Sequence, residues 1–302
     1  MRADAYSPII GRFAPTPSGP LHFGSLVTAL ASYCHAKSQQ GQWLIRVEDV
    51  DTPRVVEGSV DQILDDLDFF GFEWDGEILY QSHQFDRYQA GLELLLDQGH
   101  AYACECSRRI LRESKARTGP LGMIYPGTCR DKQLNQIDHS IRINTESSGT
   151  LAYRDQLYGK VAISIPEKSG DFVIRRADGI FAYHLAVVLD DELQQMNQIV
   201  RGADLLEATC LHLFLYQLFG FRAPEYLHIP LVRNNHGDKL SKQTGATALD
   251  KDKASFLLVS ALQVLGQDTD AGMQQAKPAE ILRQAVLSWD YQRIPVPEGE
   301  IY

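Results

Sequence analysis

The first hundred residues alternate short apolar runs with stretches of helical periodicity. The runs at 9–13 and 43–47 have the length and composition of buried strands. Apolar residues recur near the 3.6-residue period over 21–38, 52–71 and 84–98, which predicts three helices. A strand–helix–strand–helix order predicts an α/β domain built on a parallel sheet.

From residue 100 the pattern changes to short β-like runs, such as 140–143 and 161–165, in a stretch rich in Cys, Gly and Arg. We interpret this stretch as an insertion, after which α/β character is expected to return with strands at 172–175, 198–200 and 226–229 and helices at 183–189 and 205–219. Helices are also predicted at 255–265 and 278–287. The chain is therefore divided into a first half of the core (1–99), the insertion (100–171), a second half (172–249) and a short helical tail (250–302).

A Gly/Pro-rich turn follows the first strand, and Glu48 follows the second. Ligands of a parallel sheet bind outside the carboxyl ends of its strands, so the turn and Glu48 are predicted to share one pocket. Backbone N–H groups at a helix N-terminus attract anions, and His22, close to Gly24, can donate to a phosphate oxygen. Seen alone, the turn fits equally well a plain helix start with a surface histidine.

A doubly basic loop lies more than 200 residues later, where Lys239 and Lys242 flank Leu240 and Ser241. Such a loop can bring positive charge to a developing pyrophosphate. Taken alone, it fits an exposed basic loop. Together with the histidine turn, in this order, it predicts a chain that holds a triphosphate from both sides.

Three cysteines, Cys104, Cys106 and Cys129, are spaced as candidate zinc ligands. A structural zinc site needs four ligands, and Tyr125, His139 or His100 could supply the fourth. Zinc ligation by a phenolate is uncommon, so spacing alone favours a histidine. The alternative is a set of small buried thiols without a metal.

Composition changes this picture in two ways. Five cysteines in 302 residues, with no signal-like or membrane-spanning stretch, indicate a cytoplasmic protein without a membrane partner. The net charge of −10 argues against broad, charge-driven binding to nucleic acid. A local basic stretch remains, and it is either a solvated helix face or a contact strip for an RNA backbone: Arg108, Arg109, Arg112, Lys115 and Arg117.

The two phosphate-handling segments carry a family resemblance. The run at 15–25 resembles the HIGH motif of class I aminoacyl-tRNA synthetases of the glutamyl type, and 239–243 resembles their KMSKS motif. Ser25 replaces the last His of the first motif, and Gln243 replaces the last Ser of the second. The resemblance extends to about residue 249, where glutamyl-tRNA synthetases continue with a large anticodon-binding region. A chain of this length that opens on Arg12-Phe-Ala-Pro is similar to the glutamyl-Q tRNA(Asp) synthetase family.

This resemblance implies a Rossmann-type catalytic core with a zinc-bearing insertion, a short helical C-terminal region and no anticodon-binding domain. It implies activation of L-glutamate by ATP with Mg²⁺, then transfer to the queuosine base at the wobble position of tRNA(Asp). By the same resemblance His22 and Lys242 are catalytic, ATP is bound by His22, Gly24, Lys239 and Lys242, and Zn²⁺ is held by Cys104, Cys106, Tyr125 and Cys129.

A glutamate substrate needs cations for its two carboxylates and an acidic group for its ammonium. The resemblance implies glutamate contacts from Arg12, Phe13, Ala14, Pro15, Thr16, Glu48, Tyr183 and Arg201. We assign Tyr183 and Arg201 to the side-chain carboxylate and Glu48 to the ammonium. Structural alternatives exist, because Arg201 could pair with Asp204 or Asp190, and Glu48 could pair with Arg46.

Three other functions are considered. A short glutamyl-tRNA synthetase that charges an acceptor end is disfavoured because the expected anticodon region is missing. A catalytically silent RNA-binding paralogue is disfavoured by the presence of Arg12, Glu48, Arg201 and Lys242. A nucleotidylyltransferase shares the style of the histidine turn but needs neither the glutamate-binding set nor the cysteine insertion.

Overall fold

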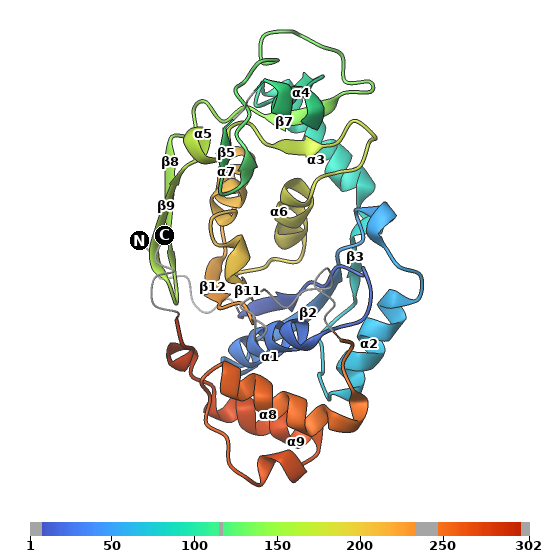
Figure 1. Cartoon of the computed structure of the whole chain (residues 1–302), viewed down its shortest axis with the longest axis vertical. Helices are drawn as coiled ribbons and strands as arrows, with labels where there is room; N and C mark the ends of the chain where they lie inside the picture. Colours follow the sequence, from blue (N-terminus) through green and yellow to red (C-terminus); the bar gives the residue numbers. More distant parts are fainter. Residues whose placement is uncertain (1–7, 115–116, 233–246, 297–302) are drawn as a thin grey trace.

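The computed structural model describes residues 8–114, 117–232 and 247–296 (Figure 1). Three parallel strands open the chain, in the order β1–β2–β3, and two further parallel strands, β11 and β12, form a second ladder. Their bounds are β1 (Ile10–Phe13), β2 (Gln42–Val47), β3 (Leu79–Tyr80), β11 (Gln198–Gly202) and β12 (Glu225–Ile229).

The two ladders lie side by side. Ile10 N donates to Asn197 Oδ1 at 2.8 Å, and Asn197 N donates to Ile10 O at 3.2 Å, which holds β11 next to β1. The spatial order is therefore β3–β2–β1–β11–β12. The first half of the chain adds strands on one side of β1, and the second half adds them on the other side. This arrangement confirms the parallel α/β core.

One long helix links the sheet to the tail of the chain. Helix α1 (Phe23–Lys37) packs against β1, β2 and β11 on one side and against α8 (Ala254–Val264) and α9 (Pro278–Ser288) on the other. The rings of Trp43 and Tyr33 meet edge-on within the shared core, and both side chains are buried. The two tail helices lie below α1 in Figure 1 and close this core from outside.

A second hydrophobic core lies on the other side of the sheet. It joins α3 (Phe85–Asp97), α6 (Tyr183–Leu193) and α7 (Thr209–Phe219) to the antiparallel strands of the middle segment. These strands form a sheet in the order β10–β7–β4 and a hairpin of β8 and β9. The middle segment comprises β4 (Ala101–Cys104), α4 (Arg108–Glu113), β5 (Thr118–Gly119), β6 (Gly122–Met123), β7 (Ser140–Ile143), β8 (Thr150–Asp155), β9 (Gly159–Ser164), α5 (Ile165–Lys168) and β10 (Val173–Arg175).

Two expectations from the sequence were wrong in detail. The strand expected to resume the parallel core, β10, instead pairs antiparallel with β7 of the middle segment. The single helix expected over 52–71 is a short 3-10 turn at Thr52–Arg54 followed by α2 (Ser59–Phe69). The break arises because Val56 N donates to Pro17 O at 2.9 Å and Gly58 adopts a φ of 73°, neither of which a continuous helix allows.

The remaining predicted elements are found within one to four residues of their expected ends. Short 3-10 turns complete the chain at Gln81–His83, Ala203–Leu205, Lys251–Lys253, Met273–Gln275 and Tyr291–Arg293. Among the described helices, none combines the length and the apolar character needed to cross a bilayer.

Candidate active site

A cavity of about 910 Å³ opens at the carboxyl ends of the parallel strands. Its walls come from the turn after β1, the end of β2, the end of β11 and the segment after β12. This is the position at which doubly wound sheets bind ligands, next to the point where the strand order reverses. The prediction that the Gly/Pro turn and Glu48 share one pocket is confirmed, since both line this cavity.

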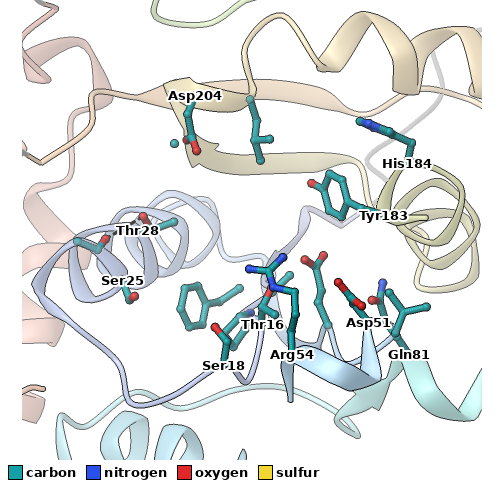
Figure 2. A pocket seen from close by; sticks show the side chains of 18 of the residues that line it. Thr16, Ser18, Ser25, Thr28, Asp51, Arg54, Gln81, Tyr183, His184 and Asp204 are labelled. Atoms are coloured by element: carbon teal, nitrogen blue, oxygen red, sulfur yellow. Dashed lines mark hydrogen bonds between the residues drawn. The ribbon is translucent and has the colours of Figure 1, made fainter. Parts of the chain in front are cut away.

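The predicted site residues divide into three groups. Phe13 to Thr16, His22, Gly24, Glu48 and Tyr183 line the cavity. Arg12 and Arg201 are almost fully buried beneath its wall, at 4% and 5% exposure. Lys239 and Lys242 lie outside the described residues. Figure 2 shows Ser25 and Thr28 of α1 at one end of the cavity and Tyr183 and Asp51 at the other.

His22 forms the N-cap of α1. Its Nδ1 accepts a hydrogen bond from Ser25 N at 3.3 Å, so the proton of a neutral imidazole resides on Nε2. The chain that follows 233–246 returns to this turn, where Ala248 bridges His22 and Leu249 N donates to Leu21 O at 3.2 Å. The turn therefore offers helix N–H groups and an imidazole N–H together, which suits an anionic ligand.

Glu48 stands at the end of β2, where its backbone N–H donates to Pro15 O at 3.0 Å. Burial raises the pKa of its carboxyl to about 7. The guanidinium groups of Arg12 and Arg46 act against this rise, and the charge of Asp191 adds to it. Near neutral pH a carboxyl with this pKa is only partly ionised. A cationic ligand stabilises the ionised form, so its binding is coupled to loss of the proton.

The arginines near Glu48 are held by other acids. Arg46, fully buried, donates from Nη2 to Asp191 Oδ1 at 2.6 Å and from Nε to Gln194 Oε1 at 2.8 Å. Arg12 Nε lies 3.5 Å from the same Asp191 oxygen. The hydrogen bonds that hold Arg46 in place are therefore not to Glu48, which lines the cavity.

Arg201 is fixed by a set of neutral partners behind Tyr183. Its Nη1 donates to Tyr183 Oη at 3.2 Å, its Nη2 to Thr209 Oγ1 at 2.7 Å, and its Nε to His228 Nε2 at 3.1 Å. Both terminal nitrogens also lie 3.3 Å from His212 Nδ1. Because these partners are uncharged, they orient the guanidinium without neutralising it.

The histidine tautomers follow from the fact that arginine only donates. His228 Nε2 and His212 Nδ1 must accept from Arg201, so their protons lie on the opposite nitrogens. Those nitrogens face Asp155 Oδ2 at 2.7 Å and His184 Nδ1 at 3.0 Å. Burial lowers the pKa of His184 and of His228 to about 4 and that of His212 well below its usual value, which keeps all three neutral.

This chain of histidines was missed by sequence reasoning. Asp155, His184, His212 and His228 come from β8, α6, α7 and β12, and no spacing along the sequence connects them. A buried strand or helix that carries a histidine amid apolar residues is the one sequence feature that could have drawn attention to them.

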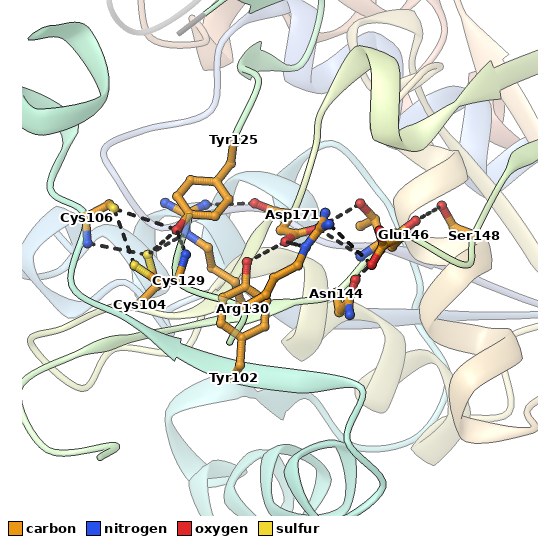
Figure 3. A network of polar contacts seen from close by, with 12 residues as sticks. Tyr102, Cys104, Cys106, Tyr125, Cys129, Arg130, Asn144, Glu146, Ser148 and Asp171 are labelled. Atoms are coloured by element: carbon orange, nitrogen blue, oxygen red, sulfur yellow. Dashed lines mark hydrogen bonds and ion pairs between the residues drawn. The ribbon is translucent and has the colours of Figure 1, made fainter. Parts of the chain in front are cut away.

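A separate cluster of sulfur atoms forms a candidate metal centre (Figure 3). The Sγ atoms of Cys104, Cys106 and Cys129 all lie within 4.8 Å of one another, and two of them are 3.5 Å apart. Tetrahedral zinc with Zn–S bonds of about 2.3 Å places sulfurs about 3.8 Å apart, so the cluster fits such an ion. Tyr125 Oη lies 3.3 Å from Cys104 Sγ and 3.6 Å from Cys106 Sγ, which makes it a fourth donor at the same point.

No histidine of the described residues belongs to this cluster. Arg142 Nε donates to Cys104 Sγ at 3.2 Å, and its guanidinium lies 4.0 Å from the centre of the Tyr125 ring. Burial alone would raise the pKa of the Cys104 thiol, but hydrogen bonds from Tyr125 and Arg142 and the Arg142 charge lower it. A thiolate, the form that binds metal, is therefore favoured at Cys104.

Asp171 organises the support of this cluster. Its carboxylate accepts two hydrogen bonds from Arg130, at 2.7 and 2.9 Å, one from Tyr102 and two from Thr145. The preceding Gly170 has a φ of 63°, and a Cβ there would clash with the backbone of Tyr125. This tight backbone approach fixes the position of Tyr125, whose hydroxyl faces the cysteines in Figure 3.

Comparison with known proteins places the whole chain. Residues 8–295 match the family model described as tRNA synthetases class I (E and Q), catalytic domain. Curated relatives named glutamyl-Q tRNA(Asp) synthetase include those of Ectopseudomonas mendocina (48% identity, 95% of each chain), Dechloromonas aromatica (46%, 96% of each chain) and Escherichia coli K12 (45%, 95% of this chain and 90% of the relative).

The solved structures agree on the fold. A glutamate-tRNA synthetase from Elizabethkingia anophelis superposes with a TM-score of 0.77 at 24% identity, over 95% of this chain and 66% of the other. The family match and the curated relatives lead to one conclusion. The chain belongs to the glutamyl and glutaminyl class I tRNA synthetases and carries their catalytic domain.

Proposed function

We propose that this protein activates L-glutamate with ATP and transfers the glutamyl group to the queuosine base of tRNA(Asp). The observation that carries the proposal is the pairing, at one cavity, of an acidic group with raised pKa, Glu48, and a guanidinium with neutral partners, Arg201, behind Tyr183. The names of the relatives at 45–48% identity supply the substrate class.

In this proposal Glu48 holds the α-ammonium of glutamate, and Arg201 with Tyr183 holds the side-chain carboxylate. Arg12 contributes charge from beneath the wall, and Phe13 to Thr16 shape the pocket. The α-carboxylate then faces the turn of α1, where His22 and Gly24 receive the phosphates of ATP. Lys239 and Lys242, outside the described residues, complete the ATP site from the segment that precedes Ala248, which bridges His22.

The chemistry needs no protein nucleophile. An α-carboxylate oxygen attacks the α-phosphorus of ATP and pyrophosphate leaves, giving glutamyl adenylate. Mg²⁺ supplies charge neutralisation on the phosphates when it is bound with ATP. A nucleophile on the modified base then attacks the activated carbonyl, and AMP leaves as the nucleophile loses its proton. The residues of this chain bind, orient and stabilise charge in both steps.

We also propose one structural Zn²⁺ held by Cys104, Cys106, Cys129 and Tyr125. We keep as a proposal the division of the chain into a first half of the core (1–99), the insertion that carries this zinc (100–171), a second half of the core (172–249) and the tail (250–302). Elemental analysis of purified protein should give about one zinc per chain, with Cys104→Ser losing the metal and lowering thermal stability. Unchanged zinc content in Cys104→Ser would remove the basis for this site.

The function is tested by supplying labelled glutamate, ATP and tRNA pools with or without queuosine. We expect glutamate-dependent pyrophosphate exchange, and transfer only to the pool that contains queuosine. Lys242→Ala should slow exchange strongly with little loss of glutamate binding. Transfer that ignores queuosine and is base-labile would favour acceptor-end charging, and absence of both reactions would favour a silent paralogue.

A further inference from the structure

Three arginines from distant parts of the chain converge on the mouth of the cavity. Arg54 comes from the 3-10 turn after β2, Arg108 is the first residue of α4, and Arg176 follows β10. Arg54 and Arg108 are exposed, and 47% of the Arg176 side chain is exposed. All three line the same opening, although the middle segment that carries Arg108 is organised around the cysteine cluster.

The three arginines at the rim face two carboxylates, Asp51 and Asp178, and both of these pair with Arg176. Arg176 is paired with Asp51 at 3.2 Å and with Asp178 at 2.5 Å, whereas the ion pairs of the described residues include neither Arg54 nor Arg108. The protein as a whole has a net charge of −10. A cationic rim on an acidic protein attracts a polyanion only locally, at the cavity, and leaves the rest of the surface repulsive.

Two of the arginines can be placed relative to the end of the cavity that suits a triphosphate. That end is formed by the N-terminus of α1 and the His22 turn, and Figure 2 shows Ser25 and Thr28 there. Arg54 lies between these residues and Asp51 in the same view, close to Thr16 and Ser18, and Arg176 is joined to Asp51 by an ion pair. Arg176 therefore lies at the glutamate end of the cavity and Arg54 between the two ends, where the acceptor of the glutamyl group must approach.

The neighbour of Arg108 faces a different way. Arg109, one residue along α4, is 76% exposed and donates from Nη1 to Glu113 Oε1 at 3.0 Å, and it does not line the cavity. Successive helix residues point about 100° apart, so a single helix presents one arginine to the cavity and one to solvent. Within the basic stretch, Arg109 therefore fits a solvated helix face, whereas the position of Arg108 leaves an RNA contact open. Arg109 provides a matched control for substitutions of Arg108.

We propose that Arg54, Arg108 and Arg176 bind RNA backbone phosphates on either side of the nucleotide whose base enters the cavity. The guanidinium fork suits phosphate oxygens, and single-stranded loops offer phosphates spread around a splayed base. The cysteine-centred segment then acts to place Arg108 at the entrance. This inference rests on the proposed function, because it requires an RNA acceptor at this site.

The test compares Arg54→Gln, Arg108→Gln, Arg176→Gln and the Arg54/Arg108 double variant with Arg109→Gln. Three quantities are measured for each: pyrophosphate exchange without RNA, tRNA affinity by fluorescence anisotropy at several salt concentrations, and transfer of labelled glutamate to tRNA(Asp) that carries queuosine. Circular dichroism melting checks that each variant folds.

Each rim variant should lose about fivefold in tRNA affinity and in transfer kcat/KM, and the double variant about 25-fold, with exchange within about twofold of the wild type. The slope of log affinity against log salt should flatten by about 0.7 for each arginine removed. Arg109→Gln should match the wild type in all three assays.

A parallel fall in exchange would assign the arginines to ATP or glutamate and overturn the proposal. Unchanged tRNA affinity in the double variant, or an equal loss in Arg109→Gln, would overturn it as well. If the wild type transfers nothing to tRNA(Asp), the proposed function fails. The proposal for the rim is then still tested by tRNA binding. If the wild type binds tRNA and Arg108→Gln and Arg109→Gln have equal tRNA affinity, that proposal is refuted.

Discussion

The raised pKa of Glu48 makes glutamate binding depend on pH near neutrality. With a pKa of about 7, the carboxyl is about one-tenth ionised at pH 6 and about nine-tenths ionised at pH 8. Only the ionised form binds the α-ammonium well, and apparent affinity scales with the fraction of the competent form. The dissociation constant of glutamate should therefore fall about tenfold from pH 6 to pH 8, a range in which the ammonium of free glutamate stays protonated.

Glu48→Gln removes the charge and keeps the shape of the side chain. A hydrogen bond between charged groups contributes about 1.5–3 kcal/mol, so the variant should bind glutamate about 10- to 150-fold more weakly at pH 8. Its affinity should also lose the dependence on pH between 6 and 8. Glu57→Gln, an exposed residue on the loop before α2, should behave as the wild type.

Isothermal titration of glutamate into ATP-free protein at pH 6, 7 and 8 measures both effects. The account is refuted if the wild type binds equally well at pH 6 and pH 8, or if Glu48→Gln retains the wild-type slope. A weaker but still pH-dependent variant would assign the titration to another group.

The same shift has the opposite effect on stability. A carboxyl whose pKa is raised from its ordinary 4.5 stabilises the fold below that pH, and this contribution is lost as the pH rises through about 7. The loss is on the order of 3 kcal/mol as an upper limit. Glu48→Gln should therefore unfold at a higher temperature than the wild type at pH 8 and at a similar temperature at pH 4. An equal or lower melting temperature at pH 8 would contradict the buried-carboxyl argument.

The geometry of the two centres supports three further predictions. Tyr183→Phe removes the hydroxyl that accepts from Arg201 at 3.2 Å and should raise the KM for glutamate about 5- to 30-fold in pyrophosphate exchange; an unchanged KM would exclude this contact from the site. Asp155→Ala leaves four N–H donors without their acceptor: the ring and backbone N–H groups of His228 and two further backbone N–H groups. The free energy of unfolding, measured with denaturant, should fall by about 4 kcal/mol. A loss below about 1 kcal/mol would show that the network is not needed for folding. Gly170→Ala places a Cβ against the backbone of the candidate fourth metal ligand at positive φ and should lower both metal content and melting temperature, whereas full metal retention would contradict the tight approach.

The position of the site could be predicted from the sequence because it depends on local pattern. The strand ends at Phe13 and Val47 are readable from apolar runs, and parallel strands place the segments after them at one edge of the sheet. The start of a helix at the Gly/Pro turn and the cysteine spacing are likewise encoded over a few residues. The two strand ends are enough to place the Gly/Pro turn and Glu48 at one cavity without any knowledge of long-range packing.

The rest depends on contacts that the sequence does not mark. The three-residue run of β10 has no pattern that reveals whether its partner is parallel or antiparallel, and β7 decides it. The helix expected to begin at Thr52 breaks because the remote Pro17 carbonyl takes the N–H of Val56. The neutral histidines around Arg201 come from separate elements, so only the folded core brings them together.

The central claim is that the acceptor is an anticodon base and that this cavity loads it. The most direct measurement is mass spectrometry of ribonuclease fragments of tRNA(Asp) after reaction with glutamate and ATP. The account predicts the glutamyl mass increment on the fragment that contains queuosine, with the 3′-terminal fragment unmodified. An increment on the 3′-terminal adenosine, or on neither fragment while pyrophosphate exchange proceeds, would contradict it.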